Sequence, residues 1–127
     1  MTNTELLKTA RNHLLSLHKF LVDFERSLYE GMHGQVTSGQ FLNLLLEDTE
    51  FQWLRKFSTL IVDIDEMFAQ KDGFNDEAVD THLAKLRQII AMNDDDKDFI
   101  AKYQGALQRD LDAAAKHGEL RSLLTGN

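Results

Sequence analysis

The sequence predicts an all-α protein: a four-helix up-down-up-down bundle with one additional short helix, forming a single domain over residues 1–127. Three observations lead to this prediction. Apolar residues recur at alternating steps of three and four, the spacing of helices that pack along a seam. Proline, the strongest helix breaker, is absent from the 127 residues. The polar connections are short, and short connections favour antiparallel neighbours.

The first predicted helix spans residues 4–31. Its apolar positions keep the three–four spacing and are Leu7, Ala10, Leu14, Leu17, Leu21, Phe24 and Leu28. Asn3 or Thr4 can cap its start, because a side-chain oxygen there accepts a hydrogen bond from an otherwise unpaired amide. Gly31 and Gly34 weaken or end the helix.

A short apolar helix is expected after a loop over residues 35–39. Ser38 can cap it, and nearly all that follows is apolar: Phe41, Leu42, Leu44, Leu45 and Leu46. Such a segment, apolar on nearly every side, predicts a position wedged between other helices. Asp48 or Thr49 caps the third helix. Its seam consists of Leu54, Phe57, Ile61, Ile64 and Phe68, with Phe51 and Trp53 near its start.

Two further helices are predicted in the second half. Asp72-Gly73 is a turn signal, and Asn75 or Asp76 can cap the fourth helix. The apolar face of this helix consists of Val79, Leu83, Leu86 and Ile90. Asp96 is the expected cap of the fifth helix, which carries Ile100, Tyr103, Leu107, Leu111 and Ala114 and ends near Gly118. The tail over residues 120–127 is expected to fold back through Leu123 and Leu124.

The composition disfavours several classes of function. The net charge is −7, no basic run is present, and acids dominate residues 72–98, so nucleic acid is not an expected partner. The absence of cysteine excludes disulfides and thiol chemistry. No apolar run approaches the about 20 residues that cross a membrane, and the first residues lack the pattern of a signal peptide. We therefore expect a cytoplasmic protein with no membrane partner.

Two stretches resemble a family of small uncharacterised bacterial all-helical proteins. They are residues 17–34, LHKFLVDFERSLYEGMHG, and residues 41–66, FLNLLLEDTEFQWLRKFSTLIVDIDE. The recognisable pieces are Asp23-x-Glu25-Arg26 with Tyr29, His33-Gly34, Phe51-x-Trp53-Leu54-Arg55 and Leu60-Ile61-Val62-Asp63. Relatives are expected to carry a proline near Thr49, where this chain has threonine. The resemblance covers about residues 17–66. It implies a helical fold and carries no activity, cofactor or catalytic residue.

The sequence contains no complete catalytic or metal-binding motif. Glu30-x-x-His33 places a carboxylate and an imidazole on one helix face, but di-iron bundles need two such pairs and two further glutamates. The nucleophile-elbow and phosphate-loop patterns are missing. The acidic run 94–98 lacks the glycine and the final glutamate of a calcium-binding loop. We therefore expect no metal, no cofactor and no catalytic residue.

One polar cluster is the candidate site. His18 and Glu25 lie seven residues apart, so they project from the same flank of the first helix. Arg26 and Tyr29 form an i, i+3 pair on the adjoining surface, and Asp65 flanks the seam of the third helix. We expect Arg26 or His18 to meet Asp65 where the two helices pack. The cluster is either a set of interhelical contacts that fix register or a polar ligand pocket with His18 as its titratable group.

Two functional hypotheses follow. The first is a non-enzymatic protein-interaction or regulatory bundle whose partner is another protein or a second copy of the chain. Phe20 extends a second contact face in this hypothesis and Trp53 is an anchor, although core packing is the favoured explanation for both. The alternative is a small-ligand- or metal-binding bundle built around the polar cluster. The first is favoured because no site has the residues and spacing that known chemistry demands.

Overall fold

The computed structural model describes residues 1–126, and these residues form helices and connections without a strand. The prediction of an all-α protein is confirmed. In chain order the elements are α1 (Asn3–His33), α2 (Ser38–Glu47), the 3₁₀ helix η1 (Thr49–Leu54), α3 (Arg55–Phe68), α4 (Asp76–Ile90), α5 (Lys97–Arg109) and α6 (Leu111–Thr125).

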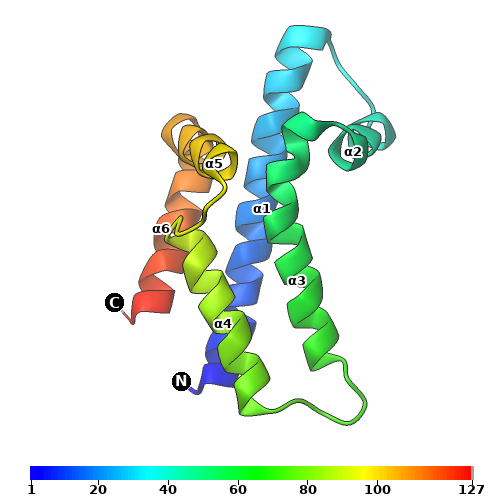
Figure 1. Ribbon diagram of the computed structural model, residues 1–127. Helices are drawn as coiled ribbons and strands as arrows, with labels where there is room; N and C mark the ends of the chain where they lie inside the picture. The colour runs from blue at the N-terminus through cyan, green and yellow to red at the C-terminus, as the bar shows by residue number, and fades with distance from the viewer. Residues whose placement is uncertain (127) are drawn as a thin grey trace.

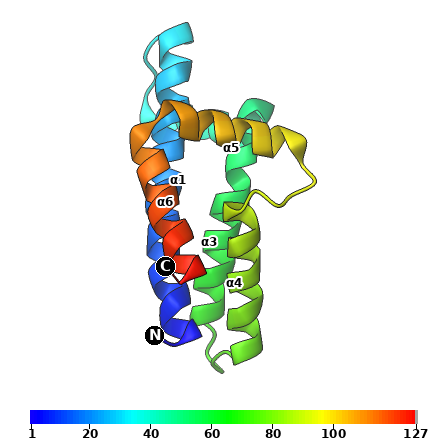
Figure 2. The ribbon, with the colours of Figure 1, turned by 90° about the vertical axis from the view of Figure 1, so that its left-hand side faces the viewer.

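Four of these helices lie along one another. The longest, α1, contacts α3, α4 and α6, and α4 contacts both α3 and α6. Figure 2 shows α5 running across the others at the end of the molecule away from the N-terminus. Figure 1 shows α2 set to one side, beyond the start of α3. Among the described helices, none is long and apolar enough to cross a membrane.

The first two helices begin one or two residues earlier than predicted. Thr2 caps α1, and its hydroxyl accepts a hydrogen bond from the Glu5 amide at 3.1 Å while the Glu5 carboxylate accepts one from the Thr2 amide. Thr37 caps α2 by the same reciprocal arrangement with Gln40. A threonine followed three residues later by glutamate or glutamine satisfies two unpaired amides at once, which favours these positions over single-bond caps at Asn3, Thr4 or Ser38.

One hydrophobic core joins all the elements, and the seam residues predicted for the first helix from Leu7 to Leu21 are fully buried in it. An aromatic cluster forms one part of this core. Trp53, Phe57, Phe99 and Tyr103 bring η1, α3 and α5 together, with the Phe57 and Tyr103 rings edge to face at 5.1 Å between centroids. This cluster binds the crossing helix α5 to the start of α3.

The predicted fifth helix is in fact two helices. Asp110 has extended backbone angles (φ −125°, ψ 111°), its amide ends α5 on the Ala106 carbonyl, and its carboxylate accepts from the Ala113 amide to begin α6. Gly118 lies inside α6, which continues to Thr125 and so includes most of the predicted tail. The apolar residues of the predicted fifth helix keep the three–four spacing as far as Leu111 and beyond, but the Leu111 side chain is 86% exposed. The spacing across the break was therefore misleading.

The prediction that the short helix is wedged between others is wrong. Only Phe41 of α2 is buried, while Leu42 and Leu46 are 54% and 58% exposed. The segment lies at the side of the molecule, where one face packs inward and the other meets solvent. The third predicted helix also differs at its start, because Asp48 caps the 3₁₀ helix η1 and the α-helix begins only at Arg55.

Candidate functional site

The predicted contact between Asp65 and the polar cluster of α1 is not formed. Asp65 instead pairs with Arg11, whose Nη2 lies 2.7 Å from Oδ2 and whose Nε lies 2.9 Å from Oδ1. Two parallel hydrogen bonds to one carboxylate set the register of α1 against α3. The Arg11–Asp65 pair is an interhelical contact of the kind expected if the cluster fixed register. Arg11 makes it in place of Arg26 or His18.

Arg26 serves the connection between α1 and α2. Its Nη2 donates to the Val36 carbonyl at 2.7 Å, and its Nε lies 3.7 Å from a Glu30 carboxylate oxygen. Glu30 in turn accepts from the Val36 amide at 2.9 Å. Both polar groups of Val36 are thereby satisfied, so Arg26 holds the loop in place and does not project into a cavity.

Of the other three cluster residues, His18 lies apart from Glu25 and Tyr29. His18 is half-buried, burial lowers its pKa, and it forms no hydrogen bond or ion pair with a described residue. Glu25 has a raised pKa, chiefly because burial penalises the carboxylate, with nearby Lys102 acting in the opposite direction. Tyr29 stacks 4.5 Å from the His33 ring. Glu25 and Tyr29 share the wall of a pocket of ≈ 310 Å³, and His18 does not reach it.

The two residues considered as interface anchors pack inward. Trp53 is 3% exposed and lies in the aromatic cluster, where its Nε1 has no hydrogen-bond partner among the described residues. Phe20 is half-buried against the core. Within residues 1–126, no group of three His, Cys, Asp or Glu side chains is placed to hold a metal ion, so Glu30 and His33 acquire no further ligand.

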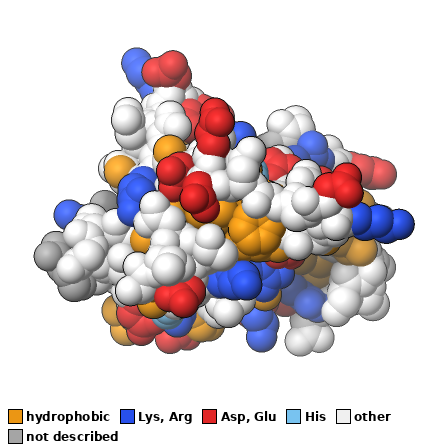
Figure 3. Space-filling view, turned by 90° about the horizontal axis from the view of Figure 1, so that it is seen from below, with side chains coloured by type: hydrophobic (Ala, Val, Ile, Leu, Met, Phe, Trp, Pro, Cys, Tyr) orange, Lys and Arg blue, Asp and Glu red, His pale blue; other side chains and the backbone are white. Residues whose placement is uncertain are grey.

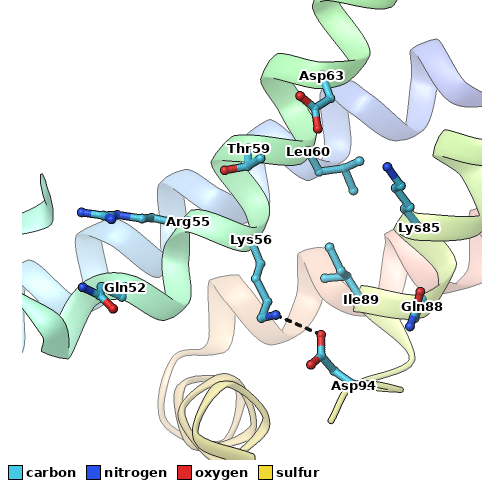
Figure 4. Close-up of a pocket in the computed structure, with 10 residues that line it drawn as sticks. All are labelled: Gln52, Arg55, Lys56, Thr59, Leu60, Asp63, Lys85, Gln88, Ile89 and Asp94. Carbon is cyan, nitrogen blue, oxygen red and sulfur yellow. Dashed lines mark ion pairs between the residues drawn. The ribbon is translucent and has the colours of Figure 1, made fainter. Parts of the chain in front are cut away.

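A groove between α3 and α4 combines apolar and charged side chains in a way that the sequence did not reveal. It encloses ≈ 420 Å³ and is drawn in Figure 4. Its lining residues come from η1, α3, α4 and the loop that follows α4, and they are Gln52, Arg55, Lys56, Thr59, Leu60, Asp63, Lys85, Gln88, Ile89 and Asp94. None belongs to the predicted cluster, because these positions lie mainly on the side of α3 opposite Asp65.

The floor of the groove is apolar and its rim is polar. Leu60 is 4% exposed and Ile89 is half-buried, and Figure 4 shows their side chains extending from α3 and α4 toward one another. Around this floor stand ammonium, carboxylate and amide groups. An apolar base with a few polar groups at its edge is the usual composition of a binding site.

One end of the groove is closed by an ion pair. Lys56 Nζ lies 3.2 Å from Asp94 Oδ2 and 5.3 Å from the centre of the Phe99 ring. The pKa of Asp94 is lowered, first by the hydrogen bond it accepts from the Asp96 amide at 2.8 Å and then by Lys56. These contacts hold the loop after α4 against α3.

The other end carries two charges that are not neutralised by a close partner. Lys85 on α4 and Asp63 on α3 line opposite walls, and neither forms a hydrogen bond or an ion pair with a described residue. Both act at longer range on His82, whose pKa is lowered chiefly by burial, further lowered by Lys85 and partly restored by Asp63. A ligand group of opposite charge can therefore approach either residue without breaking an existing contact.

A further hollow of ≈ 550 Å³ lies against α2 and the connection that precedes it. Figure 3 views the end where the chain begins and α3 turns toward α4, and there acidic and basic side chains are interspersed around a small hydrophobic patch. Exposed apolar side chains occur singly on several elements, including Leu15 on α1 and Val62 on α3. Comparison with protein-family models, with curated proteins and with solved structures finds no match to this chain.

Proposed function

We propose that this protein is a non-enzymatic interaction bundle that binds a segment of a partner polypeptide in the α3–α4 groove. The observation that carries the proposal is the pair of unneutralised charges, Lys85 and Asp63, on facing walls above the apolar floor of Leu60 and Ile89. The segment that fits presents one apolar side chain to the floor, with an acidic residue toward Lys85 and a basic residue toward Asp63.

The shape of the groove favours a polypeptide over a small molecule. Sites for small molecules bury about 70–90% of their ligand. Here the side chains of Gln52, Arg55, Thr59, Lys85 and Gln88 are all exposed, so the groove is open to solvent along its length. An extended or helical segment can enter such an open groove and continue beyond it at the end that carries Asp63 and Lys85.

The chemistry of the lining favours binding over catalysis. Its one hydroxyl, that of Thr59, forms no hydrogen bond to a histidine or carboxylate among the described residues, so no base is placed to activate it. In this proposal α1, α3, α4 and α6 act as a rigid up-down-up-down bundle that holds the two walls apart, and α5 crosses it to support the loop of Asp94.

The test is a selection of short peptides from a random display library on the immobilised protein. We expect enrichment of an apolar residue flanked by one acidic and one basic residue. The double reversal Asp63→Lys with Lys85→Glu should lower the affinity of selected peptides at least tenfold. It should also restore binding to peptides in which the two flanking charges are exchanged, since the wall charges are then exchanged too.

Lys71→Glu with Asp72→Lys is the matched control, because it makes the same pair of charge changes at two exposed positions outside the groove. Selected peptides should bind this variant within twofold of wild type. A selection that enriches no sequence, or peptides that bind the double-reversal protein as tightly as wild type, would contradict the proposed function.

A further inference from the structure

The pocket of ≈ 310 Å³ that Glu25 and Tyr29 share lies between the last turns of α1 and the start of η1, and we call it the α1–η1 hollow. Its α1 wall follows the helical repeat through Glu25, Leu28, Tyr29, Met32 and His33. Figures 1 and 2 show these last turns of α1 extending beyond the other helices. One face of a single long helix therefore forms most of the site.

Three rings line the α1–η1 hollow. The Tyr29 and His33 rings stack with their centroids 4.5 Å apart, and the Phe51 ring lies at 62° to Tyr29 with 6.2 Å between centroids. Phe51 is 4% exposed, and the buried Phe41 of α2 packs against it at 5.4 Å. The negative face of an aromatic ring attracts a cation, so rings that packing holds in place favour a positively charged ligand.

One carboxylate of the hollow has no partner. Asp48 accepts a hydrogen bond from the Glu50 amide at 2.9 Å, and the Glu50 carboxylate lies 3.6 Å from Lys102 Nζ. Glu25 is half-buried and forms no hydrogen bond or ion pair with a described residue. Burial raises the pKa of Glu25, although Lys102 and Arg109 act at longer range in the opposite direction. A cation that enters the hollow neutralises this carboxylate without breaking an existing ion pair.

We propose that the α1–η1 hollow binds a small molecule with a quaternary ammonium group, which lies against the rings of Tyr29 and Phe51 and close to the Glu25 carboxylate. Small-molecule sites enclose about 300–1,000 Å³, and this hollow lies at the lower end of that range. It shares no lining residue with the α3–α4 groove, so the inference goes beyond the proposed function.

The chemistry of the walls distinguishes between kinds of cation. A metal ion needs several ligand atoms, and within residues 1–126 no group of three His, Cys, Asp or Glu side chains is placed to hold one. A primary ammonium has three N–H donors, whereas the hollow offers one carboxylate without a partner, that of Glu25. A quaternary ammonium has no N–H group, so aromatic faces and a single carboxylate are sufficient for it.

The test is a titration of the isotope-labelled full chain with choline, followed through the amide chemical shifts in two-dimensional NMR spectra. We expect saturable shifts centred on residues 25–33 and 48–51, with a dissociation constant of about 1 mM. The neutral isostere of choline, in which carbon replaces nitrogen, should bind about tenfold more weakly because it lacks the charge. Ethanolamine, a primary ammonium, should also bind about tenfold more weakly.

Two variants test the named contacts. Glu25→Gln should weaken choline binding about tenfold and leave binding of the neutral isostere unchanged, and Tyr29→Leu should weaken choline binding about fivefold. Glu66→Gln is the matched control, because it makes the same change as Glu25→Gln at an exposed position of α3 outside the hollow. This control should bind choline within twofold of wild type. Circular dichroism establishes that each variant remains helical.

Several results would overturn the inference. One is choline that produces no saturable shift up to about 50 mM. Others are a neutral isostere or ethanolamine that binds as tightly as choline, and a folded Glu25 or Tyr29 variant that binds choline like wild type. The groove variant Asp63→Lys with Lys85→Glu should bind choline within twofold of wild type, and a larger change would place the ligand in the groove instead. Failure of the peptide selection on the groove leaves these measurements unaffected.

Discussion

Replacing Tyr103 with phenylalanine removes one hydroxyl from the aromatic core and leaves the ring in place. Tyr103 is fully buried, and its Oη lies 2.6 Å from Nδ1 of His117 on α6. Burial raises the pKa of Tyr103, so the hydroxyl keeps its proton and donates it. Burial, and then Arg121, lower the pKa of His117, so the imidazole stays neutral and accepts. The bond joins the crossing helix α5 to α6.

The expected loss of stability is about 1 kcal/mol, the net value of one hydrogen bond after exchange with water. The phenylalanine ring keeps its contact with Phe57, so no cavity is added. The His117 residue is only half-buried, so we expect water to replace the lost hydrogen bond and no full desolvation penalty to follow. For 127 residues at about 2.1 cal/mol/K each, the unfolding entropy is about 270 cal/mol/K, so the midpoint should fall by about 4 °C.

The assay is urea unfolding at pH 8, followed by circular dichroism, for wild type, Tyr103→Phe, His117→Leu and the double variant. The double-mutant cycle isolates the pair, and we expect a coupling energy of about 0.5–1.5 kcal/mol. A coupling energy below about 0.3 kcal/mol would show that Tyr103 and His117 act independently. The account of how α5 is joined to α6 would then be wrong.

Three further predictions concern other contacts. Asp110→Ala removes the cap of α6 and should lower the free energy of unfolding by about 1 kcal/mol, measured by urea titration, whereas Asp110→Asn should keep most of it. Burial lowers the pKa of His18 in the folded protein, so as the pH falls the unfolded chain binds a proton at His18 before the folded protein does. The free energy of unfolding should therefore fall as the pH drops below 6.5 and level off below the lowered pKa. In urea titrations, the free energy of unfolding of His18→Gln should fall less between pH 7.5 and pH 5 than that of wild type. An equal fall would show that His18 is not the source of the pH dependence. Arg26→Met frees the Val36 carbonyl, so amide hydrogen exchange should accelerate in residues 36–41 and not in α4.

The helical class and the inner faces of the helices were predictable from the sequence. The three–four spacing placed Leu14, Ile64 and Leu86 in the core, and all three are fully buried. This succeeds because a helix that buries one face must repeat apolar residues at its own period, wherever it packs. The cap at Asp96 was also predicted from local chemistry alone. Asn75 and Asp48 were each one of two predicted cap candidates, and Asp48 caps η1 and not the α-helix that follows it.

The break at Asp110 was missed for a local reason. No glycine or proline marks it, and Leu111 continues the apolar spacing although it is 86% exposed. An aspartate such as Asp110 is common on the exposed face of a helix, so the sequence does not mark it as a cap. It acts as one only because the chain leaves the helical conformation at that residue. The aromatic contacts of Tyr103 with Trp53 and Phe57 support α5 in its crossing position, and those are long-range contacts.

The candidate site was decided by packing. Arg11 and His18 flank the first seam and Arg26 lies on the adjoining surface. The sequence could not show which of them reaches Asp65, because that depends on the axial offset and rotation between α1 and α3. The groove was missed for the same reason. Lys85 and Asp63 line the same groove only because α4 folds back against α3.

The sequence by itself determined that the chain is helical, which residues of most helices turn inward, and where several helices begin, because these depend on the period of the backbone and on atoms a few residues apart. Only the tertiary structure decided that α5 crosses the other helices, that α2 turns leucines outward, and that a charged groove opens between α3 and α4. Those features depend on the offset and rotation of one helix against another. They are set by the sum of many contacts distant in the chain, which no local pattern encodes.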